Sequence, residues 1–143
     1  MGGNAITFML RQSIYIPRYD WTVVVFYESD RHDAHVILDE LYEAGADSRT
    51  LAKAEDNLYG GLPDTGLTFS NMDNRISVIV LSHTSSKAEF ANTWLHEVLH
   101  CATHIATAVG LDLKGEAVAY VGGELARDMQ PVAARLMCPT CKD

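Results

Sequence analysis

The feature of this sequence that most constrains its fold is a long amphipathic segment from Lys87 to Val109, which is followed by Gly110. At 100° per residue its apolar side chains fall on one broad stripe, which predicts a helix that packs one face against a core. Gly110 is a natural end for this helix, because glycine readily adopts the left-handed conformation found after many helices. The predicted stripe consists of Phe90, Trp94, Leu95, Val98, Leu99, Ala102, Ile105 and Val109.

Shorter apolar runs before this helix predict β-strands. The runs are rich in β-branched and aromatic residues, and turn-forming residues separate them. Asn71, Met72, Asp73 and Asn74 supply turn chemistry between the last two runs, which predicts a hairpin. The predicted strands cover residues 5–10, 13–16, 22–27, 66–70 and 75–81.

Three further helices complete the predicted fold. The first begins after Ser29 or Asp30 and ends at Gly45, and the second covers residues 48–58. The last begins near Glu116, and Pro131 should kink or end it. Strands, two helices, a hairpin and two more helices are typical of one α+β domain with a small mixed sheet. We therefore expect a single domain over residues 1–143, with residues 137–143 as a flexible tail.

Length, composition and charge narrow the class of protein. The chain has 143 residues, of which 48% are hydrophobic, enough for one core. Its formal net charge of -8 argues against nucleic acid and against an anionic membrane surface as partners. No segment approaches the ~18 apolar residues of a membrane span. The start, Met1 to Leu10, lacks the pattern of a secretory signal, so we expect a cytoplasmic protein.

The long helix contains a motif typical of zinc hydrolases. His96, Glu97 and His100 form the pattern H-E-x-x-H. The two histidines lie one turn apart on one face of the helix, so both imidazoles can reach one ion at about 2.0–2.1 Å. Glu97 lies where it can take a proton from a zinc-activated water, which makes it the expected general base. On the helical projection, all three side chains fall opposite the apolar stripe. The motif predicts one Zn²⁺ per chain.

His104 extends the row of histidines by one more turn. The helix rises about 12 Å from His96 to His104, too far for three imidazoles to close on one tetrahedral ion. We therefore interpret His104 as a residue that supports the ligands or is simply exposed. His32 and His35, early in a helix, are expected to be solvated, and Cys101 is expected to be a buried thiol.

Two motifs together resemble a known family. The H-E-x-x-H helix, followed by Gly115-Glu116-Ala117-Val118-Ala119-Tyr120, looks like the gluzincin type of zinc metallopeptidase. The chain is most similar to small zincin-like proteins of phage and prophage type. The resemblance covers residues 66–120. It implies a zincin-like domain, Glu116 as the third zinc ligand, and a sheet edge before the active helix that holds an extended peptide.

Chain length between the motifs permits this role for Glu116. Residues 110–115 can span up to about 20 Å when extended, enough to lead the chain back from the end of the helix toward His100. The alternative is that Glu116 is a first-turn glutamate that only favours the helix dipole. The sequence leaves both interpretations open.

The expected function is that of a zinc-dependent hydrolase, specifically a metallopeptidase that acts on a peptide or protein. A non-catalytic zinc-binding structural module is one alternative, and a metal-free interaction protein is another. Cys138 and Cys141 form a C-x-x-C pair, which suits a tail, a zinc site shared across a dimer, or redox chemistry. The oligomeric state cannot be predicted from these patterns.

Overall fold

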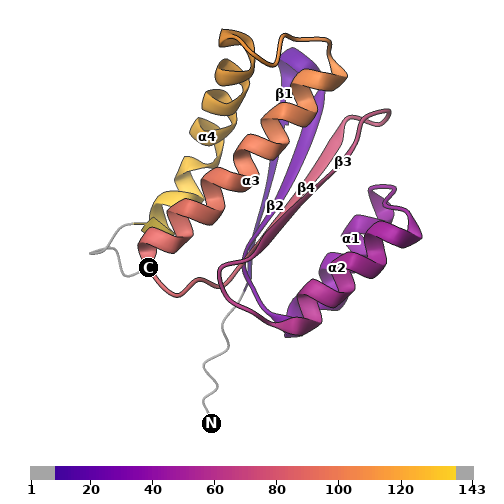
Figure 1. Cartoon of the computed structure of the whole chain (residues 1–143), viewed down its shortest axis with the longest axis vertical. Coiled ribbons are helices and arrows are strands. Elements are labelled where there is room, and N and C mark those ends of the chain that lie inside the picture. The colour runs from indigo at the N-terminus through magenta and orange to yellow at the C-terminus, as the bar shows by residue number, and fades with distance from the viewer. Residues whose placement is uncertain (1–8, 138–143) are drawn as a thin grey trace.

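The computed structural model describes residues 9–137, which form one sheet with helices on both of its faces (Figure 1). Residues 5–8 of the first predicted strand, and the pair Cys138 and Cys141, lie outside this range. The elements are β1 (Leu10–Ile16), β2 (Trp21–Ser29), α1 (Ala34–Glu43), α2 (Ser48–Gly60), β3 (Gly66–Asn71), β4 (Ile76–Ser82), α3 (Lys87–Ala108) and α4 (Glu116–Met137).

The sheet is mixed, as the sequence predicts. Its strand order is β1-β2-β4-β3. β1 is antiparallel to β2, β2 is parallel to β4, and β3 is antiparallel to β4. The predicted hairpin turn is confirmed, because the Asn71 side chain accepts hydrogen bonds from the backbone N–H groups of Asp73 and Asn74. β3 therefore lies at one edge of the sheet, with α1 and α2 on one face and α3 and α4 on the other.

The central strand β2 explains why helices cover both faces. Alternate side chains of a strand point to opposite faces, and β2 is apolar at nearly every position. Val23, Val25 and Tyr27 pack in the core beneath α3 and α4. Val24 and Phe26 pack in a second core beneath α1 and α2. The buried strand predicted at 22–27 is thus confirmed.

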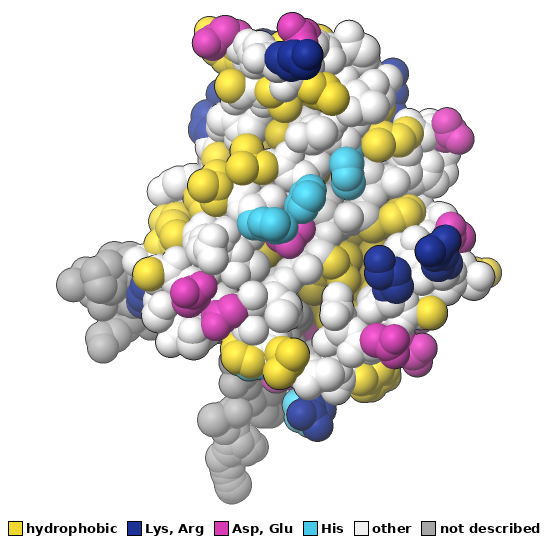
Figure 2. All heavy atoms as spheres, viewed as in Figure 1, with side chains coloured by type: hydrophobic (Ala, Val, Ile, Leu, Met, Phe, Trp, Pro, Cys, Tyr) yellow, Lys and Arg dark blue, Asp and Glu magenta, His cyan; other side chains and the backbone are white. Residues whose placement is uncertain are grey.

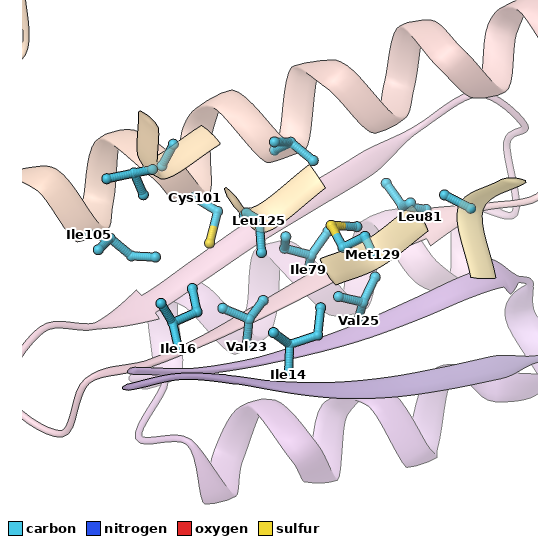
Figure 3. Close-up of a cluster of buried hydrophobic side chains, with 14 of the residues drawn as sticks. Ile14, Ile16, Val23, Val25, Ile79, Leu81, Cys101, Ile105, Leu125 and Met129 are labelled. Atoms are coloured by element: carbon cyan, nitrogen blue, oxygen red, sulfur yellow. The ribbon is translucent and has the colours of Figure 1, made fainter. Parts of the chain in front are cut away.

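The core beneath α3 and α4 fixes the helix that carries the H-E-x-x-H motif. Cys101 and Ile105 project from α3, and Leu125 and Met129 from α4, onto Val23, Val25 and Ile79 of the sheet (Figure 3). The predicted buried thiol at Cys101 is confirmed, and burial raises its pKa to about 12. The helix that begins at Glu116 is confirmed as well, with Val121, Leu125 and Met129 fully buried.

Two predicted ends of elements are not observed. Pro131 does not end α4, which continues to Met137. Ala133 beyond it is fully buried and Leu136 packs on the core, and burial of this last segment outweighs the hydrogen bond that proline removes. The gap predicted between residues 10 and 13 is also absent, because β1 is continuous from Leu10 to Ile16. The side-chain amide of Gln12 donates to the carbonyl oxygen of Asp128 and accepts from the hydroxyl of Tyr27, so this polar residue is accommodated in the strand.

Among residues 9–137, none of the helices is both long enough and apolar enough to cross a membrane.

The packing of α4 leads to a stability prediction. Leu125→Ala should lower the free energy of unfolding by about 2–5 kcal/mol, because a fully buried leucine leaves a cavity between α4 and the sheet. Leu113→Ala is the matched control, since Leu113 is exposed in the loop before α4 and should cost less than about 0.5 kcal/mol. Urea unfolding measures both variants. Equal effects would show that α4 does not share the core.

Candidate metal centre

The middle of α3 presents His96 and His100 to solvent. Ser86 caps this helix, because its hydroxyl accepts a hydrogen bond of 3.0 Å from the backbone N–H of Glu89. The histidines of α3 form a row across the surface (Figure 2). The Nε2 atoms of His96 and His100 lie 3.1 Å apart, and their rings are nearly perpendicular with centroids 4.7 Å apart. The Nε2 atoms of the two imidazoles therefore point toward the same position.

This arrangement fits the geometry of zinc. Two nitrogens that are each about 2.0–2.1 Å from one tetrahedral ion lie about 3.3 Å from each other. The Nε2 atoms of His96 and His100 are close to that separation. Imidazole nitrogen is also a ligand that zinc prefers. The pair could therefore offer two ligands to a zinc ion without rearrangement of the helix.

Glu97 lies on a different side of α3 from the one predicted. The predicted position was the polar face opposite the apolar stripe, whereas the side chain is only 5% exposed and faces β3. The hydroxyl of Thr68 donates a 2.6 Å hydrogen bond to Glu97 Oε1. Around the circumference of α3, Glu97 lies between the exposed histidines and the residues that pack in the core. β3 covers this side of the helix.

Gly66 makes room for the Glu97 carboxylate. A Cβ at position 66 would lie 2.9 Å from Glu97 Oε2 and 3.0 Å from the carbonyl oxygen of Val80. The contact with Glu97 Oε2 is closer than real Cβ atoms show, and the contact with the backbone oxygen of Val80 in β4 is tighter than most. The close approach of β3 to α3 therefore depends on glycine at this position.

His104 is half-buried beside β3. Its Nδ1 lies 2.8 Å from the hydroxyl oxygen of Ser70. Burial lowers the pKa of His104, the nearby His100 lowers it further, and the Glu97 carboxylate acts in the opposite direction. His104 is thus held by β3 and not simply exposed. By contrast, His32 and His35 are exposed, as predicted.

The predicted apolar stripe of α3 is wrong at two positions. Leu95 and Leu99 are 54% and 55% exposed. Leu95 lies two turns before Ala102 and Leu99 lies one turn before it. Because Ala102 lies against α4, both leucines are on the side of α3 that faces α4. The buried face of α3 covers only the residues that pack on the sheet and at the contact with α4. This face is narrower than the predicted apolar stripe. These two leucines therefore form an apolar border beside the histidine pair.

The structure does not bring Glu116 to the histidines. A Cβ at Gly122 of α4 would lie 3.7 Å from the Cβ of Ala102, so these residues mark where the two helices cross. Glu116 lies earlier on α4 and is exposed, roughly 12 Å along the helix axes from the level of His100. Within residues 9–137, no three His, Cys, Asp or Glu side chains gather into a metal-binding group. A ligand role for Glu116 stays a prediction.

Three residues around the motif were missed in the sequence. Gly66, Thr68 and Ser70 are alternate residues of β3, so they share the strand face that lies against α3. Leu67 and Phe69 between them pack on the opposite core. The alternation of small polar and apolar residues over 66–70 was the available signal.

No protein-family model matches the chain, and no curated protein and no solved structure matches it. The chemistry of the site therefore rests on the geometry of α3 and β3.

The contact between Gly66 and Glu97 is testable by substitution. Gly66→Ala should destabilise the fold by about 1–3 kcal/mol, because the added methyl group overpacks a site bounded by backbone. Gly60→Ala is the matched control, since a Cβ at position 60 meets nothing within 4 Å. Urea unfolding compares the two, and equal stability of both variants would contradict the close approach.

Proposed function

We propose that this protein is a zinc-dependent hydrolase, and specifically a metallopeptidase. His96 and His100 hold the metal, and Glu97 is the general base. The observation that carries the proposal is the convergence of two Nε2 atoms at 3.1 Å on the helix that also carries the buried Glu97, whose carboxylate Thr68 holds in place. If the two histidines were only solvated residues of a surface helix, a buried carboxylate on the same helix would have no role to play with them.

The residues of the chain account for the proton transfers of peptide hydrolysis. Bound zinc would supply a Lewis acid and acidify a water. Thr68 donates to Oε1 of Glu97, so Oε2, which lies beside Gly66 of β3, is the oxygen that would accept a proton from the attacking water. Glu97 then delivers this proton to the nitrogen of the departing amine. Burial of Glu97 against β3 keeps its carboxylate in one orientation for both transfers.

A groove beside the site supports a peptide substrate. β3 pairs with β4 on one side only, so its other edge offers unpaired backbone groups. A groove follows β3 between α2 and α3, and its walls include Lys53 from α2 and His104 from α3. An extended peptide can add to such an edge through main-chain hydrogen bonds. The groove leads along the same strand that holds Glu97.

The alternatives are less well supported. A structural zinc site needs four protein ligands, one more than a catalytic site that keeps a position open for water. An acidic chain with a net charge of -8 does not favour nucleic acid as a partner. We retain the cytoplasm as the proposed location.

The metal is tested first. We expect about one zinc per chain by elemental analysis after dialysis, because His96 and His100 offer a preformed pair. His96→Ala and His100→Ala should each abolish this zinc, whereas His35→Ala, which removes an exposed histidine of α1, should retain it. A wild-type stoichiometry near zero that added zinc does not raise would refute the metal proposal.

Glu116 is tested in the same assay. If Glu116 is the third ligand, Glu116→Ala should weaken zinc binding strongly, since two histidines alone hold zinc poorly. Most of its stability deficit should then disappear in a chelator, because the deficit comes from lost metal. If zinc affinity is unchanged and the deficit persists in the chelator, Glu116 is only a helix-start residue. In that case Asp112 becomes the next candidate.

The role of Glu97 is tested by activity. Glu97→Gln should lower kcat for hydrolysis of a quenched fluorescent peptide library by roughly 10²–10⁴-fold, because it removes the base. Zinc should stay bound, since Glu97 is not a ligand in this proposal. Glu55→Gln, at an exposed position of α2, is the charge-matched control. Loss of zinc from the Glu97 variant would contradict the role.

A further inference from the structure

A chain of hydrogen bonds leads from the core of the sheet to His104. The indole Nε1 of the fully buried Trp21 lies 2.9 Å from the hydroxyl oxygen of Ser77. The hydroxyl oxygens of Ser77 and Ser70 lie 2.7 Å apart. Ser70 in turn lies 2.8 Å from His104 Nδ1. The chain therefore connects β2, β4 and β3 with the third histidine of α3.

The buried end of this chain begins with a group that can only donate. An indole N–H only donates, so the Ser77 oxygen accepts from Trp21. Ser77 is fully buried, and its own hydroxyl hydrogen can point to Ser70 or to the Cys101 thiol, whose pKa a Ser77 hydrogen bond lowers. When Ser77 donates to Ser70, the hydrogen of Ser70 is directed to Nδ1 of His104, which then accepts. Because Nδ1 accepts in this arrangement, the proton of the neutral imidazole must reside on Nε2.

This tautomer distinguishes His104 from its two neighbours. A metal ligand offers a lone pair, whereas Nε2 of His104 carries a hydrogen and is a donor. The rings of His100 and His104 have centroids 6.4 Å apart, so the donor lies one turn beyond the candidate metal pair. His104 also lines the groove along β3. A donor on this side chain would therefore border the space proposed for the peptide.

We propose that His104 donates a hydrogen bond from Nε2 to the carbonyl oxygen of the substrate, and that Ser70 and Ser77 are positioning residues that fix its tautomer. This inference rests on the proposed function. As the water oxygen bonds to the carbonyl carbon, the π electron pair moves to the carbonyl oxygen, where the N–H of His104 stabilises the negative charge. The C–N bond then breaks, and the proton that Glu97 carries goes to the amine. His104 keeps its own proton throughout.

The tautomer is measured directly by ¹⁵N-edited NMR of the histidine side chains, without any need for activity. His104→Gln identifies the signal by removing it. We expect the Nε2–H form for His104 in the wild type. Ser70→Ala should shift His104 toward a mixture of tautomers, because the fixed donor to Nδ1 is lost. A predominantly Nδ1–H form in the wild type would overturn the inference whatever the protein hydrolyses.

Kinetics complete the test on the zinc-loaded full chain with the peptide library. His104→Ala should lower kcat by roughly 10²–10³-fold with zinc content and KM little changed, and His104→Gln should recover part of the loss because its amide N–H can donate. His35→Ala should behave as wild type. Full activity in a folded His104→Ala protein, or loss of its zinc, would overturn the inference alone. A wild type that binds zinc but hydrolyses nothing would refute the proposed function, and the catalytic role of His104 with it.

Discussion

The close approach of β3 to α3 is the constraint on which the rest of the site depends. Gly66 lies so near Glu97 that a Cβ would overlap its carboxylate. Thr68, on the same face of the strand, donates to that carboxylate. A buried carboxylate is costly unless it is hydrogen-bonded, so this contact holds strand and helix in one register. Together with the core on the other side of α3, this contact sets the orientation of the helix that presents His96 and His100 to solvent.

α3 has three kinds of surface, and each has a separate physical role. Cys101 and Ile105 anchor the helix in the core that α4 shares with the sheet. Glu97 and His104 form hydrogen bonds to β3. His96 and His100 face solvent, where their Nε2 atoms converge. The rigid core thereby fixes the polar groups, and precise positioning of polar groups is what a hydrolytic site requires.

Much of the fold follows from the sequence, because the apolar periods of β2, α3 and α4 are strong and the turn at residues 71–74 has specific chemistry. The apolar periodicity of α3 could not predict which neighbouring element covers each side of the helix. A helical projection separates polar from apolar residues but does not know that β3 covers Glu97 or that α4 leaves Leu95 and Leu99 exposed. The expected helix end at Pro131 failed for a similar reason, because the burial of Ala133 that keeps α4 continuous depends on tertiary packing. The histidine pair was predictable because its geometry is local to one helix.

The central claim is that His96 and His100 ligate one zinc ion through Nε2. X-ray absorption spectroscopy at the zinc edge of the zinc-loaded full chain tests it most directly. The account predicts nitrogen and oxygen ligands at about 2.0–2.1 Å with the scattering pattern of two imidazoles, which His96→Ala and His100→Ala each reduce. A first shell of sulfur at about 2.3 Å, or a spectrum that neither variant changes, would contradict it.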